Sequence, residues 1–103
     1  MADLSGMNVY LSGPMTGRRD NNRDAFAEAK RACEEAGAEF VFNPCEAWGH
    51  TDHPASWYMA HDLHRLTECV GDKTLFDVLV QLEGWENSDG ARAEHSVAMA
   101  CGI

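Results

Sequence analysis

The segment Leu75-Phe76-Asp77-Val78-Leu79-Val80-Gln81-Leu82 is nearly continuous apolar sequence. A strand with one wet face alternates apolar and polar residues, whereas an almost unbroken apolar run is typical of a strand that is covered on both faces. Strands of that kind occur mainly in parallel sheets, because the crossover connections of such sheets place helices on both faces. The segment therefore predicts a strand in a parallel sheet.

Two further strands and three helices are predicted around this segment. Met7 to Ser12 is a short β-prone run closed by Gly13-Pro14, and Glu39 to Asn43 is a second run, ended by Pro44. Apolar residues recur at helical spacing in the remaining segments. They predict helices from Asp24 to a stop at Gly37, from Pro54 to about Val70 with an apolar stripe of Met59, Leu63, Leu66 and Val70, and from Gly90 to Cys101.

The order of the predicted elements indicates the fold class. Strands and helices alternate as β-α-β-α-β-α, which implies an α/β domain with right-handed crossovers and a small parallel sheet of three to four strands. The 103 residues suit a single domain over residues 1–103. A chain this short buries a smaller fraction of its unfolded surface than a long chain does, so we expect a homo-oligomer in which the sheet leans on a partner subunit.

Composition and charge exclude several classes of function. The formal net charge is −9, from 17 acidic and 8 basic residues, so we expect no nucleic acid polymer as a partner, although a small anion is allowed. We expect no membrane association and a cytoplasmic location, because the chain has neither a signal peptide nor an apolar run that could span a bilayer. The four cysteines form no close pair and are expected to be reduced thiols.

Ligands of open parallel sheets bind beyond the carboxyl ends of the strands, where loops and helix N-termini converge. This rule gathers three loops around one crevice: residues 12–17, 43–49 and 83–90. The loop from Ser12 to Gly17 contains two glycines, which let backbone approach a ligand, and hydroxyls that can bind an anion. As a bare turn it would have no ligand at all, and the sequence alone leaves both interpretations open.

Two carboxylates occupy unexpected places on the predicted helices. Glu94 shares its helix face with Gly90, Val97 and Cys101, so it lies in the apolar stripe, where a buried ion needs a partner or a pocket. Asp62 lies at the border of the preceding apolar stripe. A structural carboxylate capped by a neighbouring backbone would explain Glu94 equally well. Together, Glu94 and Asp62 form a pair of carboxyl groups. One nucleophile and one acid of this kind are what cleavage of a glycosidic or N-glycosidic bond requires.

Histidines offer a competing interpretation. One cysteine and four histidines are potential metal ligands: Cys45, His50, His53, His61 and His64. Their spacing matches no standard zinc template, and His61 and His64 point away from the apolar stripe of their helix. We therefore expect no metal site and no cofactor, with these histidines solvated.

Three segments, taken together, resemble the nucleoside 2-deoxyribosyltransferase superfamily, and the small uncharacterised bacterial and phage members most of all. They are Tyr10-Leu11-Ser12-Gly13-Pro14-Met15-Thr16-Gly17, Asp62-Leu63 and Gly84-Trp85-Glu86-Asn87-Ser88-Asp89-Gly90-Ala91-Arg92-Ala93-Glu94. The similarity covers nearly the whole chain in order, and the third segment is its most specific part.

The resemblance implies a Rossmann-like (flavodoxin-like) three-layer fold and covalent catalysis. Glu94 would attack the anomeric carbon of a nucleoside, Asp62 would protonate the departing base, and Tyr10 would orient the nucleophile. The sugar would then pass from Glu94 to another base or to water. The residues expected to bind substrate are Ser12, Gly13, Pro14, Met15, Thr16, Gly17, Trp85, Ser88 and Gly90.

Ser88 bears on the substrate class. The transferase branch of the superfamily usually carries an aspartate at this position, and a serine is similar to the branch that hydrolyses deoxynucleoside 5′-monophosphates, where the hydroxyl helps bind phosphate. A plain N-cap serine explains the residue equally well. We therefore expect a small-molecule nucleoside or nucleotide partner and an N-glycosidase or deoxyribosyltransferase activity. The alternative is a protein that binds or sequesters a nucleotide in the same pocket without turning it over.

Overall fold

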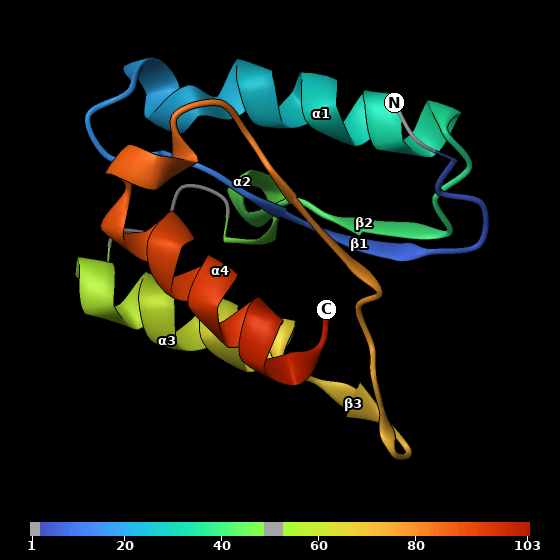
Figure 1. Cartoon of the computed structure of the whole chain (residues 1–103). Helices are drawn as coiled ribbons and strands as arrows, with labels where there is room; N and C mark the ends of the chain where they lie inside the picture. The colour runs from blue at the N-terminus through green and yellow to red at the C-terminus, as the bar shows by residue number, and fades with distance from the viewer. Residues whose placement is uncertain (1–2, 49–52) are drawn as a thin grey trace.

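The computed structural model describes residues 3–48 and 53–103 and has the predicted α/β architecture. Three parallel strands form the sheet, in the order β2-β1-β5: β1 (Asn8–Ser12), β2 (Phe40–Phe42) and β5 (Val78–Gln81). Helix α1 (Arg23–Glu35) covers one face, and α3 (Ala55–Leu66) and α4 (Asp89–Cys101) cover the other (Figure 1). This arrangement confirms the prediction of a small, Rossmann-like, three-layer fold.

Alternation along β1 sends neighbouring side chains into two separate cores. Val9 and Leu11 pack towards α1, in a cluster that includes Phe26 and Cys33. Tyr10 points to the opposite face, where it packs in a second cluster of Phe42, Leu66, Phe76 and Ala98. Ser12 shares the parity of Tyr10 and is also buried. The central strand therefore delivers one tyrosine and one serine to the face covered by α3 and α4.

The predicted helix from Pro54 to Val70 is too long. Helix α3 ends at Leu66, and Thr67 is its C-cap residue. The Thr67 hydroxyl donates a 2.8 Å hydrogen bond to the carbonyl of Leu63. Val70 is 67% exposed and belongs to an antiparallel hairpin of β3 (Cys69–Val70) and β4 (Lys73–Thr74). Gly71, with φ of +63°, makes the turn possible. Val70 fits the spacing of the apolar stripe in the sequence, but the helix ends before it and Val70 lies in a strand.

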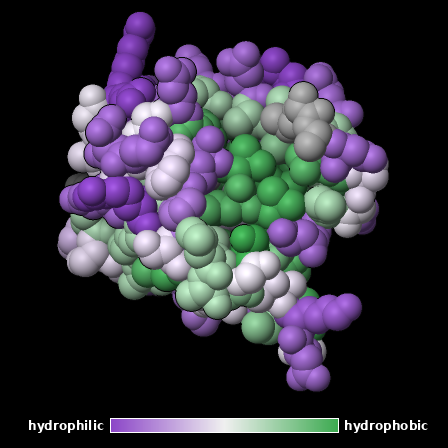
Figure 2. All heavy atoms as spheres, in the orientation of Figure 1, coloured by the Kyte–Doolittle hydropathy of each residue, from purple (hydrophilic) through white to green (hydrophobic). Residues whose placement is uncertain are grey.

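The predicted strand from Leu75 to Leu82 is shorter than its apolar run. Only Val78–Gln81 pairs with β1, and Phe76 fills the core before the strand begins. Helices cover both faces of the sheet as predicted, but β5 is an edge strand among the described residues, and each of its residues is only half-buried. Figure 2 shows an apolar area in the middle of the face where, in Figure 1, the orange segment that contains β5 crosses in front of β1.

Besides the hairpin strands β3 and β4, three short elements were not predicted: η1 (Arg19–Asn22), α2 (Pro44–Ala47) and η2 (Trp85–Asn87). All three lie in segments interpreted as loops, at the carboxyl side of β1, β2 and β5. All four cysteines are free; Cys33 and Cys45 are buried, and Cys69 and Cys101 are exposed. No helix in residues 3–48 and 53–103 is both long and apolar enough to cross a bilayer.

Candidate active site

Glu94 is the centre of a buried hydrogen-bond cluster. Ser88 caps α4, and one and a half turns later the helix directs Glu94 at the end of β1, where its side chain is 6% exposed. Tyr10 donates a short hydrogen bond to Oε2, and the hydroxyl of Ser12 donates to Oε1 over 2.8 Å. The parity of β1 explains why both donors come from one strand. The predicted placement of Glu94 in the apolar face of its helix is confirmed.

Burial raises the pKa of Glu94 to about 7. Desolvation is the main cause, because an ionised carboxylate loses more hydration than a neutral acid. The hydrogen bonds from Tyr10 and Ser12 oppose this rise, and the nearby charge of Asp62 adds to it. Burial beside Glu94 also raises the pKa of the Tyr10 phenol, which therefore stays a hydrogen-bond donor. A carboxylate with a pKa near neutrality exchanges between its acid and base forms under physiological conditions.

Asp62 lies beside this cluster on α3. It is 9% exposed, and its backbone carbonyl lies 3.3 Å from the Tyr10 hydroxyl that also contacts Glu94. The indole N–H of Trp48 donates to Oδ1 of Asp62 over 2.7 Å. Burial raises the pKa of Asp62, while the Trp48 hydrogen bond and the charge of His61 oppose the rise. One tyrosine thus contacts the carboxyl group of Glu94 and the backbone carbonyl of Asp62, and both carboxyl groups have raised pKa values, an arrangement suited to acid, base and nucleophile chemistry.

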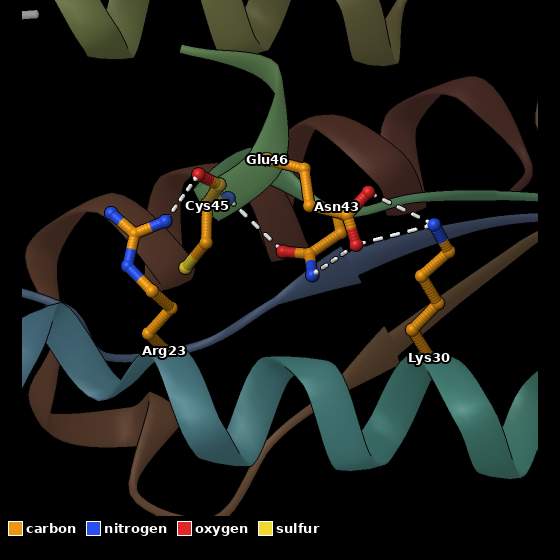
Figure 3. Close-up of polar contacts among 5 residues, drawn as sticks. All are labelled: Arg23, Lys30, Asn43, Cys45 and Glu46. Carbon is orange, nitrogen blue, oxygen red and sulfur yellow. Dashed lines mark hydrogen bonds and ion pairs between the residues drawn. The ribbon is translucent and has the colours of Figure 1, made fainter. Parts of the chain in front are cut away.

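The position of Trp48 depends on α2, which packs against α1. The side chain of Asn43 caps α2 by accepting 3.0 Å from the backbone N–H of Cys45. Glu46 pairs with Lys30 of α1 over 2.9 Å, and Arg23 of α1 donates to the carbonyl of Cys45 over 2.9 Å. Figure 3 draws these contacts. Because Trp48 directly follows α2, this double attachment to α1 holds the tryptophan at Asp62.

Ser88 lies at the start of α4, as predicted. Its hydroxyl oxygen accepts a 3.2 Å hydrogen bond from the backbone N–H of Ala91, so it is a working N-cap. Its own hydroxyl hydrogen remains to donate. Gly90 lies in the first turn, where an added Cβ would lie 3.7 Å from the sulfur of Met59. The helix N-terminus therefore carries a hydroxyl and the partial positive charge of the helix dipole.

The residues of the predicted substrate loop, Ser12 to Gly17, do not all lie at the Glu94 cluster. Ser12 joins the Glu94 cluster, whereas Thr16 and Gly17 are exposed at the surface. A Cβ at Gly13 would lie 2.8 Å from the Cβ of Leu82, so this glycine is needed for packing rather than for ligand approach. Pro14 is buried and its carbonyl accepts 3.0 Å from the side chain of Asn22. Met15 packs against the core on the α1 side.

Trp85 and Gln81 form an outer layer around the cluster. The Trp85 ring stacks on His95, with ring centroids 4.6 Å apart and an interplanar angle of 22°. Gln81 contacts Ser12, His95 and the backbone of Ala91. Sequence reasoning missed Gln81 as a site residue, although a lone amide at the carboxyl end of an apolar strand was a usable signal. It also missed the hydrogen bond from Trp48 to Asp62.

A cavity of about 550 Å³ lies on the α1 side of the sheet. Its lining combines charged and apolar residues: Arg18, Asn22, Ala25, Glu28, Ala29, Leu82, Glu83 and Gly84. None of the carboxyl groups of the Glu94 cluster lines it. Within the described ranges no group of three or more His, Cys, Asp or Glu side chains is placed to hold a metal ion, and His50 of the predicted alternative lies outside them.

Comparison with known proteins identifies the family but no activity. A family model described as "Domain of unknown function (DUF4406)" matches residues 7–103, which is nearly the whole chain. The chain therefore belongs to this family. No curated protein and no solved structure matches it.

Proposed function

We propose that this member of the DUF4406 family is an N-glycosidase or deoxyribosyltransferase that acts on nucleoside 5′-monophosphates. One observation carries the proposal: the buried Glu94 carboxyl, held on one oxygen by Tyr10 and on the other by Ser12, lies beside a second carboxyl with a raised pKa, Asp62. The resemblance of the three sequence segments to the nucleoside 2-deoxyribosyltransferase superfamily assigns nucleophile, acid and orienting tyrosine to these same residues.

In the first step a carboxylate oxygen of Glu94 attacks the anomeric carbon, and the bond from that carbon to the base nitrogen breaks. The electron pair of this bond leaves with the base, which takes a proton from the Asp62 carboxylic acid. In the second step water, or the nitrogen of another base, attacks the same carbon. The glycosyl ester breaks, Glu94 regains its charge, and Asp62 takes the proton of the incoming nucleophile. Tyr10 and Ser12 hold the ionised Glu94 in place before the first step and after the second.

The choice of a monophosphate rests on the start of α4. Ser88 accepts from the helix backbone and still has a hydroxyl hydrogen to donate to a phosphate oxygen. The free N–H groups and positive dipole end of the helix favour the same anion. The negative charge of Asp89 in the first turn opposes the binding of an anion. Arg92 forms a short ion pair with Asp89 and offsets this charge.

A binding protein without turnover is the second candidate. Its support is that Glu94 is 6% exposed and has both oxygens occupied, so that attack on a sugar requires the pocket to open. Such a protein would hold the nucleotide at the same helix terminus. Tight binding of an unchanged ligand is the result that favours this function.

The test is release of free base from a panel of deoxynucleosides and their 5′-monophosphates, followed by chromatography. We expect base release from at least one monophosphate by the native chain and none by Glu94→Gln. Glu35→Gln makes the same chemical change at an exposed position at the end of α1 and should keep full activity. Intact mass spectrometry should detect a sugar adduct on Glu94. Binding without base release by the native chain, or an adduct on another residue, would refute the proposed reaction.

A further inference from the structure

A chain of polar side chains leads from the buried Glu94 to the surface of α4. Ser12 lies 2.8 Å from Oε1 of Glu94, and Nε2 of Gln81 lies 3.4 Å from Oγ of Ser12. Oε1 of Gln81 lies 2.8 Å from Nδ1 of His95, whose ring stacks on Trp85. Three different elements, β1, β5 and α4, contribute to this chain.

The backbone of α4 fixes which way the Gln81 amide faces. The backbone carbonyl of Ala91 can only accept a hydrogen bond, and the Gln81 amide lies 3.1 Å from it. The amide nitrogen of Gln81 must therefore be the atom that faces this carbonyl. The amide oxygen therefore faces His95. Since that oxygen can only accept, Nδ1 of His95 must carry the ring hydrogen when the imidazole is neutral.

The same logic fixes the direction of the bond to Glu94. One amide hydrogen of Gln81 is used by Ala91, and the other points to Ser12, whose oxygen accepts it. The hydroxyl hydrogen of Ser12 is then left to donate to Oε1 of Glu94. When Glu94 is protonated its proton therefore resides on Oε2, facing Tyr10. Tyr10 in turn can donate to the carbonyl of Asp62, 3.3 Å away.

We propose that Gln81 and His95 are positioning residues that keep Ser12 donating to Oε1 of Glu94. Trp85 fixes the plane of the His95 ring by stacking on it. The catalytic consequence rests on the proposed function, but the direction of the hydrogen bonds is a property of the folded chain. The other titratable groups that face Glu94 are Tyr10 of β1 and Asp62 of α3. Neither of them belongs to the row of hydrogen bonds that joins Ser12, Gln81 and His95.

The first test is the tautomer of His95, observed by nitrogen NMR of the native chain with labelled histidine, at an alkaline pH where imidazoles are neutral. We expect the hydrogen on Nδ1 and a bare Nε2. His64, which is exposed on α3, is the reference for a solvated ring. A hydrogen on Nε2 of His95 would overturn the proposal, and this measurement requires no variant to fold.

The second test is the pKa of Glu94, measured by carbon NMR of the carboxyl group. Gln81→Met keeps the length of the side chain and removes the amide, so Ser12 is free to turn away. We expect the pKa of Glu94 to rise by about one unit, the effect of weakening one hydrogen bond to a charged group. His95→Phe keeps the stacking on Trp85 and should shift the pKa in the same direction by less. His64→Phe is the matched control and should leave it unchanged.

The two proposals fail in distinguishable ways. If the native chain releases base, the acid limb of its pH–rate profile should move to higher pH in Gln81→Met, with the rate recovering at alkaline pH. An equal loss of rate at every pH, or an unchanged Glu94 pKa in a folded Gln81→Met, refutes the positioning role and leaves the proposed function standing. If no base is released but the His95 tautomer and the pKa shift are found, the positioning role stands and the proposed function fails.

Discussion

The indole N–H of Trp48 donates a 2.7 Å hydrogen bond to Oδ1 of Asp62 and so joins the end of α2 to the middle of α3. The bond lowers the pKa of an aspartate whose burial raises it. It therefore sets how readily the proposed acid holds its proton. Trp48 also packs edge-on against Trp57, with ring centroids 5.3 Å apart, so its ring has neighbours that hold it in this orientation.

Replacement of Trp48 by phenylalanine should shift the activity profile to higher pH on its alkaline side. Without the donor, the ionised form of Asp62 is less favoured and its pKa rises further. The pH dependence of base release measures this shift. Trp57→Phe keeps the bond to Asp62 and serves as control for altered ring packing. An alkaline limb that stays in place in Trp48→Phe would contradict the role of this bond.

Stability should fall as the pH rises towards neutrality because of Glu94. Burial raises its pKa from 4.5 to about 7, so the folded state binds the proton more tightly than the unfolded state does. The stabilisation is complete below pH 4.5 and is lost as the pH rises through about 7, for a total of about 3 kcal/mol.

Urea unfolding of the native chain and of Glu94→Gln over this pH range measures the effect. The difference in unfolding free energy between the two should change between pH 4.5 and 7, to the disadvantage of the native chain, and should be constant above that range. Glu35→Gln should show no such trend. Parallel curves for native and Glu94→Gln would mean that Glu94 has an ordinary pKa.

Ser88→Asp separates the cap from the proposed phosphate contact. Aspartate is as good an N-cap as serine, so the free energy of unfolding should change by less than about 0.5 kcal/mol. Its charge repels a phosphate, so KM for a monophosphate should rise at least about tenfold while KM for the matching nucleoside stays the same. Ser96→Asp, at an exposed position of α4, is the control for added charge. Equal effects on both substrates would place the phosphate elsewhere.

We expect self-association through the outer edge of β5, which pairs with no other strand in residues 3–48 and 53–103. This edge strand has no charged residue, whereas the chain as a whole has a formal net charge of −9, so a second copy meets less repulsion here than elsewhere. Sedimentation velocity should detect an oligomer that strengthens with salt, because salt screens the remaining repulsion. Val80→Lys, with thermal unfolding as a check on folding, should weaken it. A native chain that stays monomeric at all salt concentrations would disprove the expectation.

Local sequence patterns determined the fold class and the main carboxylate of this protein. The apolar run around Val78 and the helical periodicity of the segments before and after it reflect burial within one element, which sequence spacing records directly. The same periodicity placed Glu94 on a buried helix face, and the structure has it there. Ser88 was recognisable as a cap because capping depends on residues only three positions apart.

Tertiary structure alone decided how the site is assembled. Trp48 and Asp62 meet because α2 is attached to α1, and the contacts of Lys30 with Glu46 and of Arg23 with Cys45 cross 16 and 22 residues of sequence. Tyr10 and Ser12 reach Glu94 across more than 80 residues. No local pattern encodes such pairings, because they depend on which elements pack together and in what register. The same cause ended α3 at Leu66, where the chain leaves the core for the hairpin that contains Val70.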